Sequence, residues 1–397
     1  MPFDVSQSRK TSFHARRYET GEPVRITLSD SRIVAVEPAW PDGPVSEWPF
    51  VAPGLFDLQV NGYGGVWFSD TLLTAEEATT AIGAYLAHGV TRLCPTLITN
   101  SFEGLAAGFS AIRQACEADP RIDYIVAGCH LEGPFLSSED GPRGAHPRQH
   151  IRPADWDEFG ELQKISGGRI RLTTIAPEVD HALEFIRRAV ASGVTVAIGH
   201  TAANTDQIAA AVDAGATLST HLGNGAHGTL RRHPNYIWDQ LGDARLTASL
   251  IVDRQHLPDS VVRSMIRAKS PARVVLTCDA SGWAGSPPGR YENELGAVEV
   301  LQSGRIVVAG QEQLLAGSGS TTEECVADCV ASGGATLREA IDMASRNPAR
   351  LLSYRESRLI AGDPADLFLF RHDGSRSRVD VVATFVQGEL CYGTIDD

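Results

Sequence analysis

The chain of 397 residues is long enough for one large domain plus a small one, and its 43% apolar and 21% charged residues exclude a disordered protein. A formal net charge of −14 excludes sequence-independent electrostatic binding to nucleic acid or to an anionic membrane. No apolar run is long enough to span a bilayer, and residues 1–20 contain no signal-peptide core. With seven scattered cysteines, these features predict a cytoplasmic protein with reduced thiols.

Both ends of the chain have the pattern of short strands joined by polar turns. RITLSDSRIVAVEP, residues 25–38, and the segment at residues 364–393 alternate β-branched or aromatic stretches with Asp, Ser and Gly. We expect residues 1–51 and 357–397 to form one small β-sandwich domain. Residues 52–356 then form the larger domain between them.

The first strand of the larger domain ends in DLQVNGYGG, residues 57–65. Gln59 and Asn61 alternate with Leu58 and Val60, so the two amides share one face of an extended segment. Neutral amides are poor ligands for a transition metal, which prefers imidazole, thiolate or carboxylate. The stretch is therefore either an ordinary strand end or part of a site completed by residues elsewhere.

One helix-to-strand unit recurs along the middle of the chain. Three segments, residues 74–96, 183–200 and 205–221, each run from a helical pattern through a glycine into a short apolar strand. The glycines are Gly89, Gly193 and Gly215, and the first helix opens with a capping box from Thr74 to Glu77. Such units predict an α/β fold with a parallel sheet, most simply a (β/α)₈ TIM-like barrel. A doubly wound open sheet is the alternative, but no G-x-G-x-x-G follows the first strand.

Four of the expected strands end on a residue that can bind a metal or carry a proton. These are Glu132 in HLEGPF, His200 in AIGH, His221 in LSTH and Asp279 in LTCD. In a barrel all four would meet at the C-terminal rim, where active sites lie. One Glu with two His is a catalytic zinc set that leaves a position for water, and a further carboxylate can act as general base and acid.

Each of these four residues has an ordinary structural explanation when it is taken alone. A histidine at a strand end is usually a hydrogen-bonded structural residue, and Asp279 before Ala-Ser-Gly could be a turn former. The coincidence of four complementary groups at equivalent places in four units favours a metal site over these explanations.

Three other motifs carry weaker signals. LAGSGSTTEE, residues 315–324, lacks the lysine of a nucleotide-binding loop, so its hydroxyl groups are expected to cap a helix. Cys325 and Cys329 lie four residues apart, which indicates a half-buried helix face. Arg231, Arg232 and His233 form a basic cluster that is either a solvated loop or a contact for a substrate phosphate.

In these motifs the sequence resembles the N-acetylglucosamine-6-phosphate deacetylase family of the amidohydrolase superfamily over nearly the whole chain. HLEGPF with the following Gly-Ala-His is the most specific match. GHTAA, THLGN, TCDASGWAG and AGSGSTT then follow in the family's order, and NPAR at residues 347–350 and AGDPADLFLF at residues 361–370 also match.

The resemblance implies a metal-dependent deacetylase that releases acetate from an N-acetyl amino sugar 6-phosphate. It implies one divalent metal per chain, Zn²⁺ above all, because Gln59 and Asn61 stand where many amidohydrolases carry two histidines. It assigns Glu132, His200 and His221 as ligands and Asp279 as the catalytic acid and base. It further implies contacts to the substrate from His146, Asn224, the backbone N–H of Gly225, His256 and Arg232. The arginine often reaches a neighbouring subunit's site in this family, which implies a homodimer or a higher oligomer.

The cavity walls depart from the family pattern while the catalytic set is intact. Ser320 stands where the family has an apolar residue near the acetyl methyl, Trp283 is added after Asp279, and Tyr236 and Trp238 add bulk to the loop at residues 231–238. The substrate could therefore be N-acetylgalactosamine-6-phosphate, an unphosphorylated N-acyl compound or a cyclic amide. A catalytically silent binding protein is disfavoured, because the ligands and Asp279 are all present.

Overall fold

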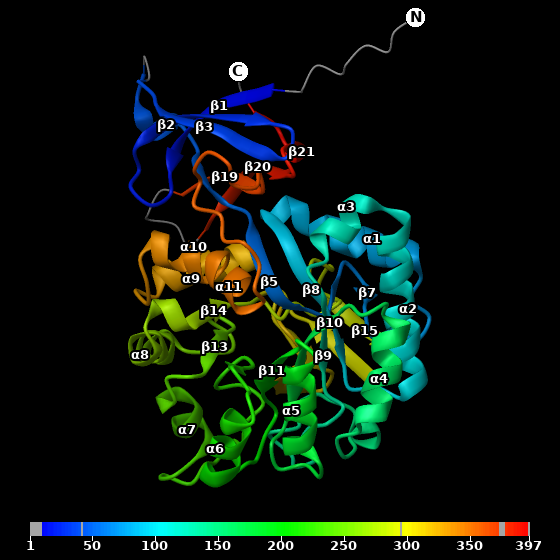
Figure 1. The fold of residues 1–397 in the computed structure, drawn as a ribbon. Coiled ribbons are helices and arrows are strands. Elements are labelled where there is room, and N and C mark those ends of the chain that lie inside the picture. The colour runs from blue at the N-terminus through cyan, green and yellow to red at the C-terminus, as the bar shows by residue number, and fades with distance from the viewer. Residues whose placement is uncertain (1–9, 41–42, 294–295, 373–377, 396–397) are drawn as a thin grey trace, which may run out of the picture.

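A computed structural model describes residues 10–40, 43–293, 296–372 and 378–395 of the chain (Figure 1). Eight parallel strands follow one another in sequence order around one sheet, which confirms the predicted (β/α)₈ barrel. The sheet closes where Val60 pairs in parallel with Ala280. The barrel strands are β5 (Leu55–Val60), β8 (Val90–Ile98), β9 (Cys129–Glu132), β10 (Ile170–Ile175), β11 (Thr195–Ile198), β12 (Leu218–Ser219), β13 (Thr247–Leu250) and β14 (Val274–Leu276).

Helices surround the barrel, and their ends are where the sequence places them. The capping box at Thr74 is present, and Gly89, Gly193 and Gly215 all have positive φ angles, of 73°, 84° and 112°. The helices are α1 (Ala75–Ala84), α2 (Phe102–Ala118), α3 (Pro120–Ile125), α4 (Trp156–Ile165), α5 (Ala182–Ala191), α6 (Thr205–Asp213), α7 (Tyr236–Gly242), α8 (Asp259–Lys269), α9 (Thr322–Ala331), α10 (Leu337–Met343) and α11 (Arg346–Leu351). The AGSGSTT motif ends at the start of α9, where Thr321 and Glu324 form a capping box as expected.

The two ends of the chain build one seven-stranded sheet beside the barrel (Figure 1). Phe13 lies in the first of these strands in chain order, and Phe385 lies in the sixth. Two other strands lie between these two in the sheet, yet the two rings stack with their centroids 5.3 Å apart. Such strands would be about 14 Å apart in a flat sheet, so this sheet folds over and packs against itself. Its strands are β1 (Lys10–Arg17), β2 (Pro23–Ser29), β3 (Arg32–Pro38), β4 (Phe50–Pro53), β19 (Leu367–Arg371), β20 (Asp380–Val386) and β21 (Glu389–Gly393).

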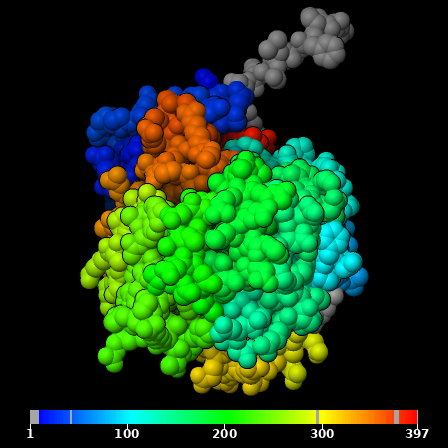
Figure 2. All heavy atoms as spheres, turned by 60° about the horizontal axis from the view of Figure 1, so that its bottom comes forward, coloured from blue at the N-terminus to red at the C-terminus, as the bar shows by residue number. Residues whose placement is uncertain are grey.

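An antiparallel sheet between β14 and α9 was not anticipated from the sequence. It contains β15 (Gly289–Asn293), β16 (Gly296–Val300), β17 (Ile306–Val308) and β18 (Gln311–Leu315), and we call it the covering sheet. Figure 2 shows its yellow residues at the edge of the molecule opposite the N-terminal strands, which are drawn in blue. A hairpin of β6 (Gly62–Tyr63) and β7 (Val66–Trp67) follows the first barrel strand.

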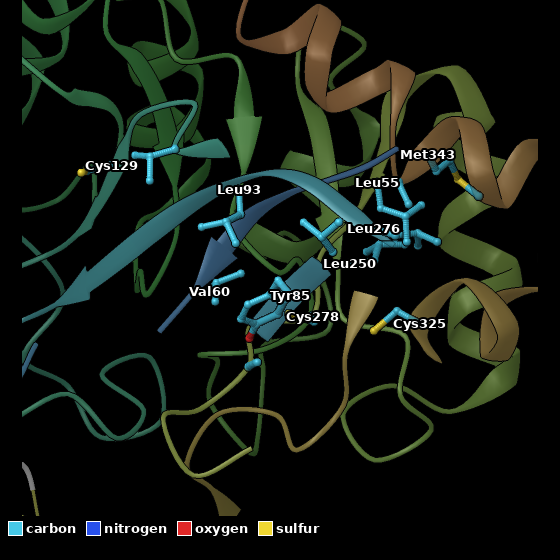
Figure 3. Packing of buried hydrophobic residues seen from close by; sticks show 14 of the residues in the cluster. Leu55, Val60, Tyr85, Leu93, Cys129, Leu250, Leu276, Cys278, Cys325 and Met343 are labelled. Atoms are coloured by element: carbon cyan, nitrogen blue, oxygen red, sulfur yellow. The ribbon is translucent and has the colours of Figure 1, made fainter. Parts of the chain in front are cut away.

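Two apolar clusters pack around and inside the barrel. The larger one packs the helices and the terminal sheet against the strands, and Figure 3 shows part of it, with Leu250 and Leu276 from adjacent strands. The second contains Phe56, Leu172 and Ala197 from three barrel strands, together with the partly buried Tyr354. In a barrel of this kind the active site is expected at the C-terminal ends of the strands. In the part of the chain that the structure describes, no helix is long and apolar enough to cross a membrane.

Candidate active site

The predicted ligands converge at the C-terminal ends of β9, β11 and β12. Nε2 of His200 and Nε2 of His221 lie 3.0 Å apart, and they lie 3.3 Å and 3.1 Å from Oε1 of Glu132. All three side chains are buried, and their ligand atoms lie within 4.8 Å of one another. Three electron-rich atoms facing one point in a buried place repel one another unless a cation or protons lie between them.

The backbone at these strand ends is strained in a way that projects the side chains into the cavity. His200, His221 and Asp279 have φ angles of 50°, 28° and 48°, in the left-handed region that non-glycine residues rarely adopt. Each such residue costs roughly 1–3 kcal/mol, and this kind of strain gathers at functional sites.

The environment of His200 selects which ring nitrogen faces the cluster. Its Nδ1 lies 2.8 Å from the carbonyl oxygen of Pro142, which can only accept, so the ring hydrogen is on Nδ1 and Nε2 is free for a ligand bond. A Cβ atom at Gly225 would lie 2.7 Å from Nδ1, and one at Gly144 would lie 3.3 Å from Cε1. Glycine at these two positions lets both loops close around the imidazole.

Gln59 and Asn61 hold the two carboxylates of the site. Nε2 of Gln59 donates to Oε1 of Glu132 at 2.8 Å, and Nδ2 of Asn61 donates to Oδ1 of Asp279 at 2.7 Å. The paired amides of the first strand therefore act as hydrogen-bond donors that orient a ligand and an acid–base group.

The two carboxylates are driven in opposite directions by their surroundings. Burial would raise the pKa of Glu132, but its close contacts with His200 and His221 outweigh burial and hold the pKa well below the usual range. Burial and the charge of Glu132 raise the pKa of Asp279 to about 7. Glu132 thus stays ionised, as a ligand must, while Asp279 is poised to exchange a proton near neutrality.

A cavity of about 690 Å³ lies over these groups and collects most of the predicted substrate residues. The strand ends and the loops after them form its floor, and the covering sheet forms its opposite wall. Predicted site residues on its lining are Asn61, Glu132, His146, His200, His221, Asn224, Gly225, His256 and Asp279.

A comparison with protein-family models matches residues 50–391 to the amidohydrolase family. The chain belongs to the amidohydrolase family. Among its relatives, an N-acetylglucosamine-6-phosphate deacetylase from Bos taurus is 34% identical over 86% of this chain and 83% of that protein. An N-acetylgalactosamine-6-phosphate deacetylase from Escherichia coli O157:H7 is 32% identical over 83% of this chain and 85% of that protein. The resemblance drawn from the motifs is confirmed.

Solved structures agree with this placement. A mutant N-acetyl-D-glucosamine-6-phosphate deacetylase from Mycobacterium smegmatis, in complex with N-acetyl-D-glucosamine-6-phosphate, is 34% identical with a TM-score of 0.83, covering 93% of this chain and 94% of that one. A deacetylase from Thermotoga maritima has a TM-score of 0.84 at 23% identity, covering 97% of this chain and 100% of that one, which supports the fold. The chain is therefore a hydrolase of amide carbon–nitrogen bonds.

Three residues singled out in the sequence lie away from the catalytic cavity of this amidohydrolase. Arg232 is exposed on the loop before α7 and is not part of the lining given by the described residues. Ser320 lines a separate cavity of about 320 Å³, which shares His256 with the catalytic one. Trp283 stacks on Tyr291 of β15, with ring centroids 4.6 Å apart.

Other residues of the amidohydrolase site escaped the sequence analysis. Arg143 lines the cavity, and its Nη1 donates to the carbonyl oxygen of His146 at 2.8 Å. Thr99 lies 2.8 Å from Nδ1 of His146, and Trp67 forms part of the wall. Arg143 directly precedes the Gly-Ala-His match and is the one of these that a search for cations near the motifs could have found.

Proposed function

We propose that this amidohydrolase removes the acetyl group from an N-acetyl amino sugar 6-phosphate, giving the free amino sugar phosphate and acetate. The substrate that we favour is N-acetylglucosamine-6-phosphate. The observation that carries the proposal is the meeting of Glu132, His200 and His221 with Asp279 in one cavity. Relatives at 31–34% identity named as deacetylases of both N-acetylglucosamine-6-phosphate and N-acetylgalactosamine-6-phosphate support the substrate class and leave two epimers to compare.

The donor set fits one divalent cation, and we assign it as Zn²⁺. Two imidazoles and one carboxylate suit zinc and leave a fourth position open. Where a second ion would need histidines on the first strand, Gln59 and Asn61 supply amides that already donate to the carboxylates. When bound there, such an ion supplies Lewis acidity that lowers the pKa of water and polarises a carbonyl oxygen.

Asp279 moves the proton in the proposed reaction. Asn61 occupies its Oδ1, which leaves Oδ2 as the oxygen to take a proton from the attacking water. The same carboxyl group then gives that proton to the leaving nitrogen, so that a free amine departs. A pKa of about 7, raised by burial and by Glu132, suits a group that must both accept and donate.

His146 is our candidate to stabilise the oxyanion. Its Nε2 lies 3.2 Å from Nε2 of His200, and burial lowers the pKa of His146 well below its usual value, so the ring is neutral. When the Thr99 hydroxyl donates to Nδ1, the ring hydrogen lies on Nε2, on the side of the ligand cluster.

For the sugar phosphate we propose contacts from Asn224, the N–H of Gly225 and His256, with Arg232 serving the cavity of a second subunit. Asn224, Gly225 and His256 line the cavity, whereas Arg232 is exposed on the loop before α7, and Trp238 in that helix is 55% exposed. This arrangement accords with a homodimer.

We also propose that the protein is cytoplasmic. The chain would divide into its two domains near residues 51 and 357, although β4 continues to Pro53.

A substrate panel tests the function. Acetate release would be measured for N-acetylglucosamine-6-phosphate, N-acetylgalactosamine-6-phosphate and both sugars without phosphate, using the metal-loaded enzyme. We expect the highest kcat/KM for a 6-phosphate. A higher value for the unphosphorylated sugars would replace the proposed substrate with an unphosphorylated N-acyl compound while keeping the metal chemistry.

A further inference from the structure

One buried carboxylate, Asp253, uses both of its oxygens to hold His256 in place. Oδ1 accepts the backbone N–H groups of Gln255 and His256 at 2.9 Å and 2.8 Å. Oδ2 lies 2.7 Å from Nδ1 of His256 and accepts the hydroxyl of Ser318 at 3.1 Å. The side chains of Asp253 and His256 are only 2% and 7% exposed, so this arrangement is shielded from water.

The hydrogen bond to Asp253 decides the tautomer of His256. Burial would raise the pKa of Asp253, but hydrogen bonds from His256 and the backbone outweigh it and lower the pKa to about 2. An ionised carboxylate can only accept, so the ring hydrogen of His256 must be on Nδ1. Nε2 then remains for whatever fills the cavity that His256 lines.

The same carboxylate joins two neighbouring strand ends. Asp253 follows β13, whereas Ser318 follows the covering sheet, and the backbone N–H of Ser318 donates to the carbonyl oxygen of Asp279 at 3.0 Å. Ser318 also pairs in parallel with Ala280. His256 is therefore fixed relative to the backbone that carries Asp279.

We propose that Asp253 is a positioning residue that fixes His256 in the Nδ1–H tautomer and aims its Nε2 at the sugar phosphate, with Ser318 as the third member. This inference rests on the proposed function only in naming what His256 binds. The tautomer is a property of the enzyme alone, so failure of the proposed substrate and failure of the inference have different signatures.

Asp253→Asn separates positioning from folding. The remaining amide oxygen can still accept the two backbone N–H groups, so the turn survives. The NH₂ group then faces Nδ1 of His256 and must donate to it, which moves the ring hydrogen to Nε2. Nitrogen-15 spectra of histidine-labelled, metal-loaded enzyme report the tautomer, and His256→Gln assigns the signal among the 12 histidines. We expect Nδ1–H in the wild type and Nε2–H in Asp253→Asn.

Kinetics supply the second readout. Asp253→Asn should lower kcat/KM for the sugar phosphate by about tenfold, mostly through KM, as expected for one misdirected hydrogen bond. In a His256→Gln background the same change should have an effect below about twofold, because Asp253 acts only through His256. Asp259→Asn is the matched control, since Asp259 is a nearby carboxylate that contacts Arg254 at 3.5 Å. It should leave the tautomer and the kinetics unchanged.

The result that overturns the inference is an unchanged Nδ1–H tautomer in Asp253→Asn, or an equal loss of kcat/KM with and without His256. Either outcome would make Asp253 a purely structural residue of the turn. If the wild type turns over no amino sugar phosphate at all, the proposed function fails, and the tautomer experiment still decides the role of Asp253.

Discussion

The floor and the covering sheet of the catalytic cavity are built on opposite physical principles. Floor side chains from the barrel strands are buried, polar and linked to one another, as when Gln59 and Asn61 donate to Glu132 and Asp279. The covering sheet presents Val298, Val308 and other apolar groups, with Gln311 and Gln313 as its polar side chains on the lining.

This difference separates chemistry from selection. The floor holds charges in a fixed geometry at some backbone strain, which is what stabilising a transition state requires. The covering sheet holds no titratable side chain on the cavity lining among the described residues, so it can shape substrate binding without carrying protons. Changes to Asp279 or to the three ligands in the floor should therefore lower kcat, whereas changes to the covering sheet should act on KM.

The largest effect is expected on removing the metal. Chelation, or His221→Ala at the ligand cluster, should abolish measurable acetate release, and Zn²⁺ should restore it to the chelated wild type only. Elemental analysis of the active enzyme should find one equivalent per chain. Two equivalents, both inside the barrel, would contradict the single-metal assignment.

Asp279→Asn should come next in size. The amide is nearly isosteric but cannot carry a proton, and losing general acid–base help costs on the order of 10²–10⁴ in rate. We expect kcat to fall in this range while the fold and the bound metal are retained, as checked by circular dichroism and elemental analysis. Near-normal kcat in a metal-replete variant would remove Asp279 from its assigned role.

Arg232→Ala should lower kcat/KM for a 6-phosphate by about ten- to a hundredfold, because a charge-assisted hydrogen bond contributes roughly 1.5–3 kcal/mol. Turnover of the sugar without phosphate should change little. If the arginine serves a second subunit, mixed dimers of Arg232→Ala with Asp279→Asn should regain activity at the one intact site. Arg143→Gln is the comparison, because Arg143 lines the cavity of its own chain. If Arg143→Gln lowers kcat/KM only for the 6-phosphate and Arg232→Ala does not, then Arg143 and not Arg232 contacts the phosphate.

The floor could be predicted from the sequence because its signals are local. Each ligand ends an apolar strand, and the fold repeats a helix, a glycine and a strand, so that His200 and His221 occupy equivalent places in consecutive units. The terminal sheet was predictable for the same reason, from turns and alternating strands. The predicted β-sandwich implies that this sheet packs against itself, but the sequence did not reveal that Phe13 and Phe385 make the contact.

Contacts between distant segments explain what was missed. Asp253 ends the apolar run of its strand much as Asp279 does, but its role depends on His256 and on Ser318, which lies 65 residues later in sequence. The role of Gln59 depends on Glu132, 73 residues later. The covering sheet was missed because its last residue, Leu315, opens the LAGSGSTTEE motif. The strands before it were counted as part of the barrel.

The smallest effect is expected in the covering sheet, where β18 offers a matched set of variants. Gln311 and Gln313 line the cavity, and Glu312 between them does not belong to the described lining, as strand alternation requires. Gln311→Ala and Gln313→Ala should each raise KM by about two- to tenfold, the equivalent of one neutral hydrogen bond, with kcat within about twofold of wild type. Glu312→Ala should change neither constant. A fall in kcat from the glutamine variants would show that the covering sheet helps to stabilise the transition state, and the division between chemistry on the floor and selection above it would then be wrong.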